Sequence, residues 1–133
     1  MLYFKEIPLL PSTCWWLDVI VCDDEQQKID YMVERYGWHK SYYQDDGYNY
    51  VTMIEPDGES IVNEDRIVLV LKDLKNKAVM VHELTHILLY AQKYIGLKVN
   101  WESQEWCACF MERIWSELCK PNYEKIKPKT AKK

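Results

Sequence analysis

The sequence contains no apolar run that approaches the roughly 20 residues of a membrane-spanning helix. Its first residues lack the charged lead, apolar stretch and small-residue cleavage site of a secretory signal. Basic residues are not in excess, because 17 lysines and arginines stand against 21 aspartates and glutamates, giving a formal net charge of -4. Contacts to nucleic-acid phosphates need a surface rich in lysine and arginine. We therefore expect a soluble, cytoplasmic protein with neither a membrane nor a nucleic-acid partner.

A regular spacing of cysteines is also missing. The chain has 5 cysteines, and no two of them form the Cys-x-x-Cys pair of a zinc knuckle. On a helix, Cys107 and Cys109 would point to different sides. Because free cysteine is among the most buried residue types, we predict that the cysteines are reduced and belong to the core.

The hydrophobic pattern indicates a single domain, residues 1–120, with strands first and helices last. Residues 1–12 contain Pro8 and Pro11 and are predicted to be an irregular lead. The predicted strands are residues 14–22, 50–55 and 66–71, with a hairpin or strand within 38–50 and a pairing segment at 60–62. The predicted helices are residues 25–36, ending at Gly37, residues 78–95, ending at Gly96, and residues 101–119, capped by Asn100 and stopped by Pro121.

This order of elements predicts an α+β fold. We expect a small twisted sheet of three or four strands, one amphipathic helix packed on it, and two long helices at the end of the chain. Residues 121–133 are rich in lysine and poor in apolar residues. We predict that they form a basic, disordered tail.

The residues with the clearest chemistry are 81–87, Val-His-Glu-Leu-Thr-His-Ile. A spacing of four places His82 and His86 one helical turn apart on the same face, where two imidazoles can bind one metal ion. Glu83 lies one position round, outside the ligand set, where it can take a proton from water activated by the metal. The surrounding residues are apolar on almost every side, which predicts a buried helix. A metal ion would give these three polar side chains the partner that burial demands.

His-Glu-x-x-His is the pattern of zinc-dependent peptidases, whose sites take a third protein ligand and leave a fourth position to water. Glu105 follows His86 with about eighteen residues between them. In this respect the sequence resembles the gluzincin metallopeptidases, above all their small, single-domain, often phage-encoded versions. The resemblance covers residues 66–118. It implies a minimal zincin-like domain in which His82, His86 and Glu105 hold Zn²⁺.

Spacing alone leaves two alternatives to Glu105 as the third ligand. The last predicted helix has two stripes. The polar stripe consists of Glu102, Glu105, Cys109 and Glu112. The apolar stripe consists of Trp106, Phe110, Ile114 and Leu118. Glu102 could take the place of Glu105, and Cys109 could replace the carboxylate as a soft ligand. Zinc itself is what the resemblance implies, since the order of metal affinities would also admit nickel, cobalt or copper.

The predicted activity is hydrolysis of a peptide bond in a peptide or protein substrate. Glu83 would act as general base and then pass the proton to the leaving amine. Tyr90, one turn beyond His86, is the first candidate for stabilising the oxyanion, followed by Tyr94 and His39. An extended peptide would dock along an edge strand beside the metal helix.

Two residues are candidates for orienting the imidazoles, because metal-bound histidine usually donates its second N–H to a neighbour. They are Thr85 and Glu112.

A different class of function is a non-catalytic protein that holds a metal and binds or inhibits a host or partner protein. A structural zinc site closes its fourth position and needs no base, so the presence of Glu83 favours the peptidase. A third hypothesis is that the pattern is accidental and the chain is an α+β interaction domain without a metal.

Overall fold

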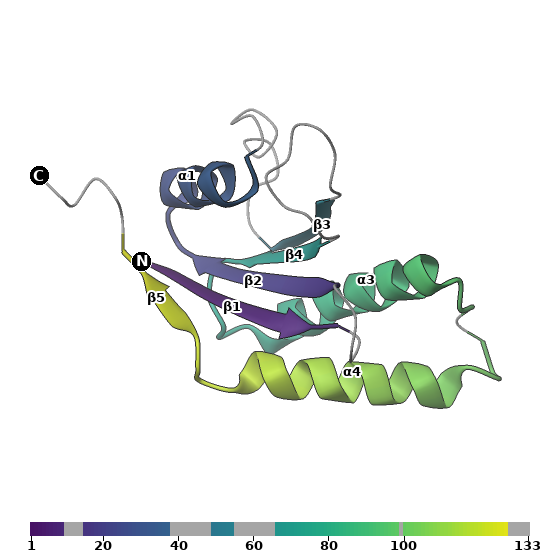
Figure 1. The fold of residues 1–133 in the computed structure, drawn as a ribbon. Coiled ribbons are helices and arrows are strands. Elements are labelled where there is room, and N and C mark those ends of the chain that lie inside the picture. Colours follow the sequence, from purple (N-terminus) through teal and green to yellow (C-terminus); the bar gives the residue numbers. More distant parts are fainter. Residues whose placement is uncertain (10–14, 38–48, 55–65, 99, 128–133) are drawn as a thin grey trace, which may run out of the picture.

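The structure is a computed structural model of the 133-residue chain, and it describes residues 1–9, 15–37, 49–54, 66–98 and 100–127. These residues form five strands and three helices (Figure 1). In chain order they are β1 (Leu2–Pro8), β2 (Trp16–Cys22), α1 (Glu25–Tyr36), β3 (Tyr50–Ile54), β4 (Arg66–Leu71), α3 (Lys77–Ile95), α4 (Gln104–Cys119) and β5 (Glu124–Ile126).

The strands form one mixed sheet in the order β3-β4-β2-β1-β5. β2 and β4 are parallel, and the other neighbouring pairs are antiparallel. α1 covers one face of the sheet, while α3 and α4 lie side by side on the other (Figure 1). The α+β class is confirmed, but the sheet has five strands rather than the expected three or four.

Alternation along β2 builds a separate core on each face of the sheet. Leu17 and Val19 pack with the apolar sides of α3 and α4, whereas Ile20 and Cys22 pack with α1. Both faces of β2 are therefore covered, which explains why the strand reads as a nearly continuous apolar run. Helices thus pack on both faces of the sheet, with α1 on one face and α3 and α4 on the other.

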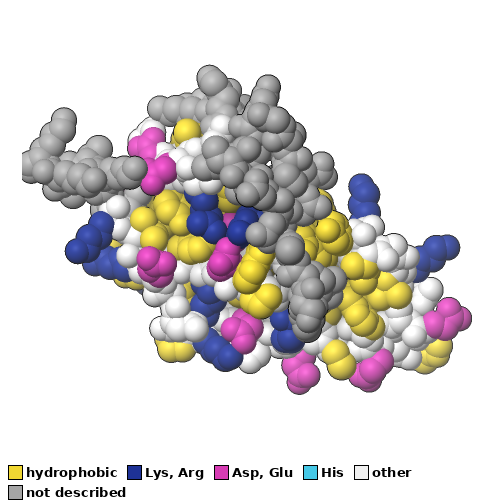
Figure 2. Space-filling view, viewed as in Figure 1, with side chains coloured by type: hydrophobic (Ala, Val, Ile, Leu, Met, Phe, Trp, Pro, Cys, Tyr) yellow, Lys and Arg dark blue, Asp and Glu magenta, His cyan; other side chains and the backbone are white. Residues whose placement is uncertain are grey.

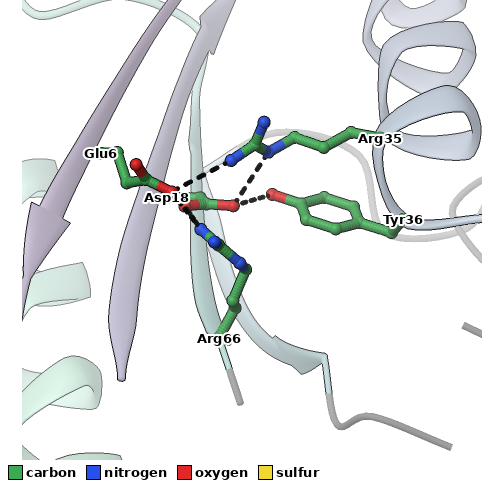
Figure 3. Close-up of polar contacts among 5 residues, drawn as sticks. All are labelled: Glu6, Asp18, Arg35, Tyr36 and Arg66. Carbon is green, nitrogen blue, oxygen red and sulfur yellow. Dashed lines mark hydrogen bonds and ion pairs between the residues drawn. The ribbon is translucent and has the colours of Figure 1, made fainter. Parts of the chain in front are cut away.

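The polar exception on the α1 face is Asp18, whose side chain is completely buried in β2. Its carboxylate accepts hydrogen bonds from the Tyr36 hydroxyl at 2.5 Å, from Arg66 at 2.7 Å and from Arg35 at 3.1 Å (Figure 3). Glu6 on β1 also pairs with both arginines. The cluster joins the end of α1 to the starts of β2 and β4. Hydrogen-bonded arginines are what allow a carboxylate to be buried there.

Helix boundaries follow the capping residues closely. Asp24 caps α1 by accepting from the Gln27 N–H at 3.0 Å, and Gly37 ends it with a positive φ of 74°. Gly96 ends α3 in the same way. These positive φ values favour glycine. The predicted ends of both helices are therefore confirmed.

The last helix starts later than predicted. Asn100 does not cap it directly; its side-chain oxygen accepts from the Glu102 and Ser103 N–H groups, both at 3.0 Å, and so builds a separate turn. Ser103 then occupies the N-cap position, and α4 runs from Gln104 to Cys119. The prediction of a start at residue 101 was wrong because asparagine satisfied the local N–H groups without forming helix.

The strands β1 and β5, which lie next to each other at one end of the sheet, were not predicted. The irregular lead expected for residues 1–12 is wrong over Leu2–Pro8, where Pro8 occupies the last position of β1 and does not interrupt the strand. The disordered tail expected for residues 121–133 is wrong over Glu124–Ile126, which pair with β1 as β5. Buried Lys5 donates to the carbonyls of Glu117 and Lys120, which anchors the chain just before β5.

Several predicted segments lie outside the described residues. They are residues 38–48 of the hairpin or strand expected within 38–50, the pairing segment at 60–62 and the last residues of the tail, 128–133. Of the described helices, none is long and apolar enough to cross a membrane. Figure 2 shows one face of the molecule, on which basic and acidic side chains are interspersed rather than gathered by sign.

Candidate metal centre

α3 carries the two histidines on a solvent-facing side of the helix. The sequence predicted a helix buried on almost every side, and this prediction was wrong. Met80, Leu84 and Ile87 face the core, whereas Val81 is 48% and Leu89 47% exposed. His82 and His86 are also exposed. The apolar composition of the helix therefore does not come from burial on every side. It leaves apolar side chains on the same surface as the imidazoles.

The structure brings His82, Glu83 and His86 together. Their nearest possible ligand atoms all lie within 4.8 Å of one another, and the two imidazole rings are 5.0 Å apart between centroids. Two nitrogen ligands about 2 Å from a tetrahedral zinc ion lie roughly 3.4 Å apart. Small side-chain rotations would bring the imidazoles to that separation. Imidazole nitrogens are ligands that suit zinc, so His82 and His86 could supply two of its ligands, with the Glu83 carboxylate beside them.

Glu83 differs from the two histidines in its burial. Its exposed fraction is 6%, and its carboxylate lies 3.9 Å from the His82 Nε2 atom. Burial raises the pKa of the Glu83 carboxyl, and the two imidazoles partly oppose that rise. A sheltered carboxylate with a raised pKa binds a proton more readily than a solvated one. This is the property that a general base requires at neutral pH.

A pocket of about 280 Å³ opens at this group, between α3 and the start of β3. Its lining residues come from both elements and are Asn49, Tyr50, Val51, His82, Glu83, His86 and Tyr90. Among the described strands, β3 is an edge strand that pairs with β4 alone. The pocket therefore lies between the three polar side chains on α3 and the start of the edge strand β3.

The three candidates for stabilising an oxyanion have different positions. Tyr90 is half-buried and lines the pocket together with the histidines. Tyr94 stacks on Trp15 with ring centroids 4.0 Å apart, and it does not line this pocket. His39 lies outside the described residues. Of the described candidates, Tyr90 is thus the one near the group.

Glu105 is not part of the group that the structure brings together. It lies in the first turn of α4, exposed to solvent, and one of its carboxylate oxygens accepts a hydrogen bond from the Cys109 thiol at 3.7 Å. α4 packs on the core with its predicted apolar stripe, which includes Phe110 and Ile114. The polar stripe consequently faces away from the core. The role of Glu105 as third ligand stays a prediction that rests on the resemblance.

Glu102 and Cys109, the alternative third ligands, also lie on the exposed side of α4 or just before it. Glu102 is exposed just before α4, and Cys109 is exposed on the same stripe as Glu105. Desolvation is the larger cause and the charge of Glu105 the next, and both raise the pKa of the Cys109 thiol. A thiol with a raised pKa is less readily converted to the thiolate that binds metal. Within the described part of the chain, neither residue joins the histidines.

The two residues predicted to orient the imidazoles make other contacts. The Thr85 hydroxyl donates to the Val81 carbonyl at 3.0 Å, within the helix backbone. Glu112 lies on the exposed side of α4. The described residues therefore contain no hydrogen bond from either one to His82 or His86.

Sequence reasoning did not identify the β3 side of the pocket. It predicted a strand from residue 50, but it gave Asn49 and Val51 no part in the site. The available signal was the Asn-Tyr pair at the start of that strand, since asparagine tolerates backbone conformations that end a turn. Which strand would become the edge depended on long-range pairing, which local patterns do not encode.

Comparisons with protein-family models, with curated proteins and with solved structures found no match to this chain.

Proposed function

We propose that this protein is a zinc-dependent peptidase in which His82 and His86 bind the metal and Glu83 is the general base. The observation that carries the proposal is the buried Glu83 carboxylate, held within the same group as two exposed imidazoles at the mouth of a pocket. A structural zinc site has no use for a sheltered base beside its ligands. Hydrolysis of a peptide bond needs such a base to take a proton from the attacking water.

In this proposal each side chain has a separate task. When bound, zinc supplies a Lewis acid that polarises the scissile carbonyl and lowers the pKa of water. Glu83 accepts the proton of the attacking water and delivers it to the leaving amine. Tyr90 donates a hydrogen bond to the oxygen that gains negative charge. Glu105 is proposed as the third ligand on the strength of the resemblance.

The proposed substrate is an extended segment of polypeptide. An edge strand offers unpaired N–H and C=O groups in a row, and a peptide can add to it as a further strand. β3 runs past the pocket that contains Glu83. A peptide paired with β3 would therefore pass its main-chain carbonyls over the two histidines.

The test combines metal content with hydrolysis. We expect about one zinc per chain in the wild type and in Glu83→Gln, and none in His86→Ala. A library of internally quenched fluorescent peptides should be cleaved by the wild type alone. Because Glu83→Gln retains the shape of the side chain, it is the matched control for loss of the base. Cleavage that survives in Glu83→Gln, or a wild type that takes up no added zinc, would refute the proposal.

The alternative is a metal-containing protein that binds a partner without cleaving it. The exposed side chain of Leu89, on the same face of α3 as the histidines, favours this second function, because exposed apolar surface beside a site is common where proteins interact. Zinc uptake by both the wild type and Glu83→Gln, with no cleavage by either, would support it over the peptidase.

A further inference from the structure

Asn49 has an unusual backbone conformation at the rim of the pocket. Its φ is 62°, the one positive value among the described residues other than glycine. Such a conformation is uncommon for a residue with a side chain, although asparagine tolerates it better than most. Strained residues of this kind tend to cluster at binding and catalytic sites. Asn49 also lines the pocket that contains the histidines.

The side chain of Asn49 is held in one orientation. Its Oδ1 atom accepts a hydrogen bond from the Lys72 N–H at 3.2 Å, just beyond the end of β4. The opposite orientation of the amide would set its NH₂ group against another donor, so this contact decides which way the amide points. The Nδ2 atom forms no hydrogen bond with the described part of the chain. The two N–H donors of the amide therefore remain, on a residue that lines the pocket.

The geometry points to Asn49 as a residue that positions the substrate, with its Nδ2 group donating to a main-chain carbonyl of a peptide lying along β3. This assignment rests on the proposed function. β3 begins at the next residue, so a peptide added to that edge passes the Asn49 side chain as it approaches the pocket. A peptide carbonyl is an acceptor of the type that an amide N–H₂ requires. The left-handed backbone and the Lys72 contact fix the donor before the peptide arrives.

Two substitutions separate this role from a structural one. Asn49→Asp keeps an oxygen for the Lys72 N–H and tolerates the positive φ, but it replaces the donor with a second acceptor. Asn49→Gly keeps the backbone conformation and loses both the acceptor and the donor. If the side chain only supports the turn, the aspartate variant should behave as the wild type. If it donates to a peptide, both variants should lose the same contact.

The experiment measures binding of two zinc-directed probes, acetohydroxamate and a dipeptide hydroxamate, to the zinc-loaded chain by calorimetry. The first offers the metal-binding group alone, and the second adds peptide carbonyls. The ratio of their affinities cancels any common effect of the aspartate charge on the metal. We expect a ratio above one in the wild type that falls about fivefold in both variants, as for the loss of one hydrogen bond.

The outcomes distinguish this inference from the proposed function. A ratio that is unchanged in Asn49→Asp, or that falls only in Asn49→Gly, would overturn the role of Asn49 and leave the metal site intact. Equal affinity of the wild type for the two probes would do the same. Failure of both probes to bind the wild type would overturn the metal site, and the assignment of Asn49 with it.

Discussion

Replacing Asp18 by asparagine tests the buried charge cluster that joins β1, β2, β4 and α1 (Figure 3). The substitution keeps the shape of the side chain and removes its charge. Among the described residues, it leaves Arg35 and Arg66 with Glu6 as their remaining acidic partner. It also sets an uncharged group against the Tyr36 hydroxyl, which lies 2.5 Å from the Asp18 carboxylate.

The expected loss is about 3 kcal/mol in the free energy of unfolding. Breaking a buried ion pair by removing one partner costs about 3 to 5 kcal/mol. The lower end applies because the side chain of Arg35 is 27% exposed and that of Arg66 is 12% exposed, so water relieves part of the unpaired charge. Glu6 relieves a further part. A loss of this size is a large share of the total stability of a small domain, which is about 5 to 15 kcal/mol.

Urea unfolding followed by tryptophan fluorescence measures this loss. With a urea dependence of about 1 to 3 kcal/mol per molar, the midpoint should fall by at least about 1 M. Asp23→Asn is the matched control, because Asp23 forms an exposed ion pair with the N-terminal amino group and its replacement should leave the midpoint unchanged. Tyr36→Phe should also destabilise the chain, and the double variant should lose less than the sum of the two.

The reasoning would be refuted by an Asp18→Asn chain that unfolds at the midpoint of the wild type. Strict additivity with Tyr36→Phe would be equally damaging, since the two groups share one hydrogen bond.

Three further predictions concern pH and metal. Burial raises the pKa of Tyr31 to about 12, so the unfolded chain ionises first as the pH passes about 10. Stability should then fall from about pH 10 towards 12, and Tyr31→Phe should flatten this fall in urea titrations across that range. A hundredfold excess of zinc over its dissociation constant should add about 2.7 kcal/mol to the free energy of unfolding; a similar gain in His86→Ala would place the binding elsewhere. Elemental analysis should find zinc lost in Glu105→Ala and kept in Glu102→Ala, and a full zinc content in Glu105→Ala would remove Glu105 from the ligand set.

Local signals predicted the helices better than the sheet. Asp24 and Gly37 bracket α1 in the sequence as they do in the structure, because capping depends on neighbouring N–H and C=O groups alone. The strand β4 was also predicted with the bounds it has, Arg66–Leu71, since a short apolar run between polar residues is a strong pattern. α3, whose end at Gly96 was also predicted, carries His82, Glu83 and His86, and the structure brings these three side chains together.

The remaining features depend on contacts between distant residues. β5 has one apolar residue, Ile126, and forms because β1 offers it a free edge. Local composition predicts disorder for such a segment. The exposure of His82 and His86 likewise depends on where α3 lies against the sheet. A helical stripe shows that side chains share a face, but it does not show whether that face meets the core, which is why the position of Glu105 was not predictable.

The pairing of β1 with β5 has a consequence for how this chain can be cut. β1 lies near the start of the sequence, and the outer edge of its first part, Leu2 to Phe4, is covered by residues 124–126. A fragment that ends at residue 120, where the sequence alone suggested a domain boundary, would keep both long helices and all the pocket residues. It would nevertheless expose the N–H and C=O groups of β1 to other molecules. We expect such a fragment to self-associate through β1, while the full chain protects this part of the edge with β5.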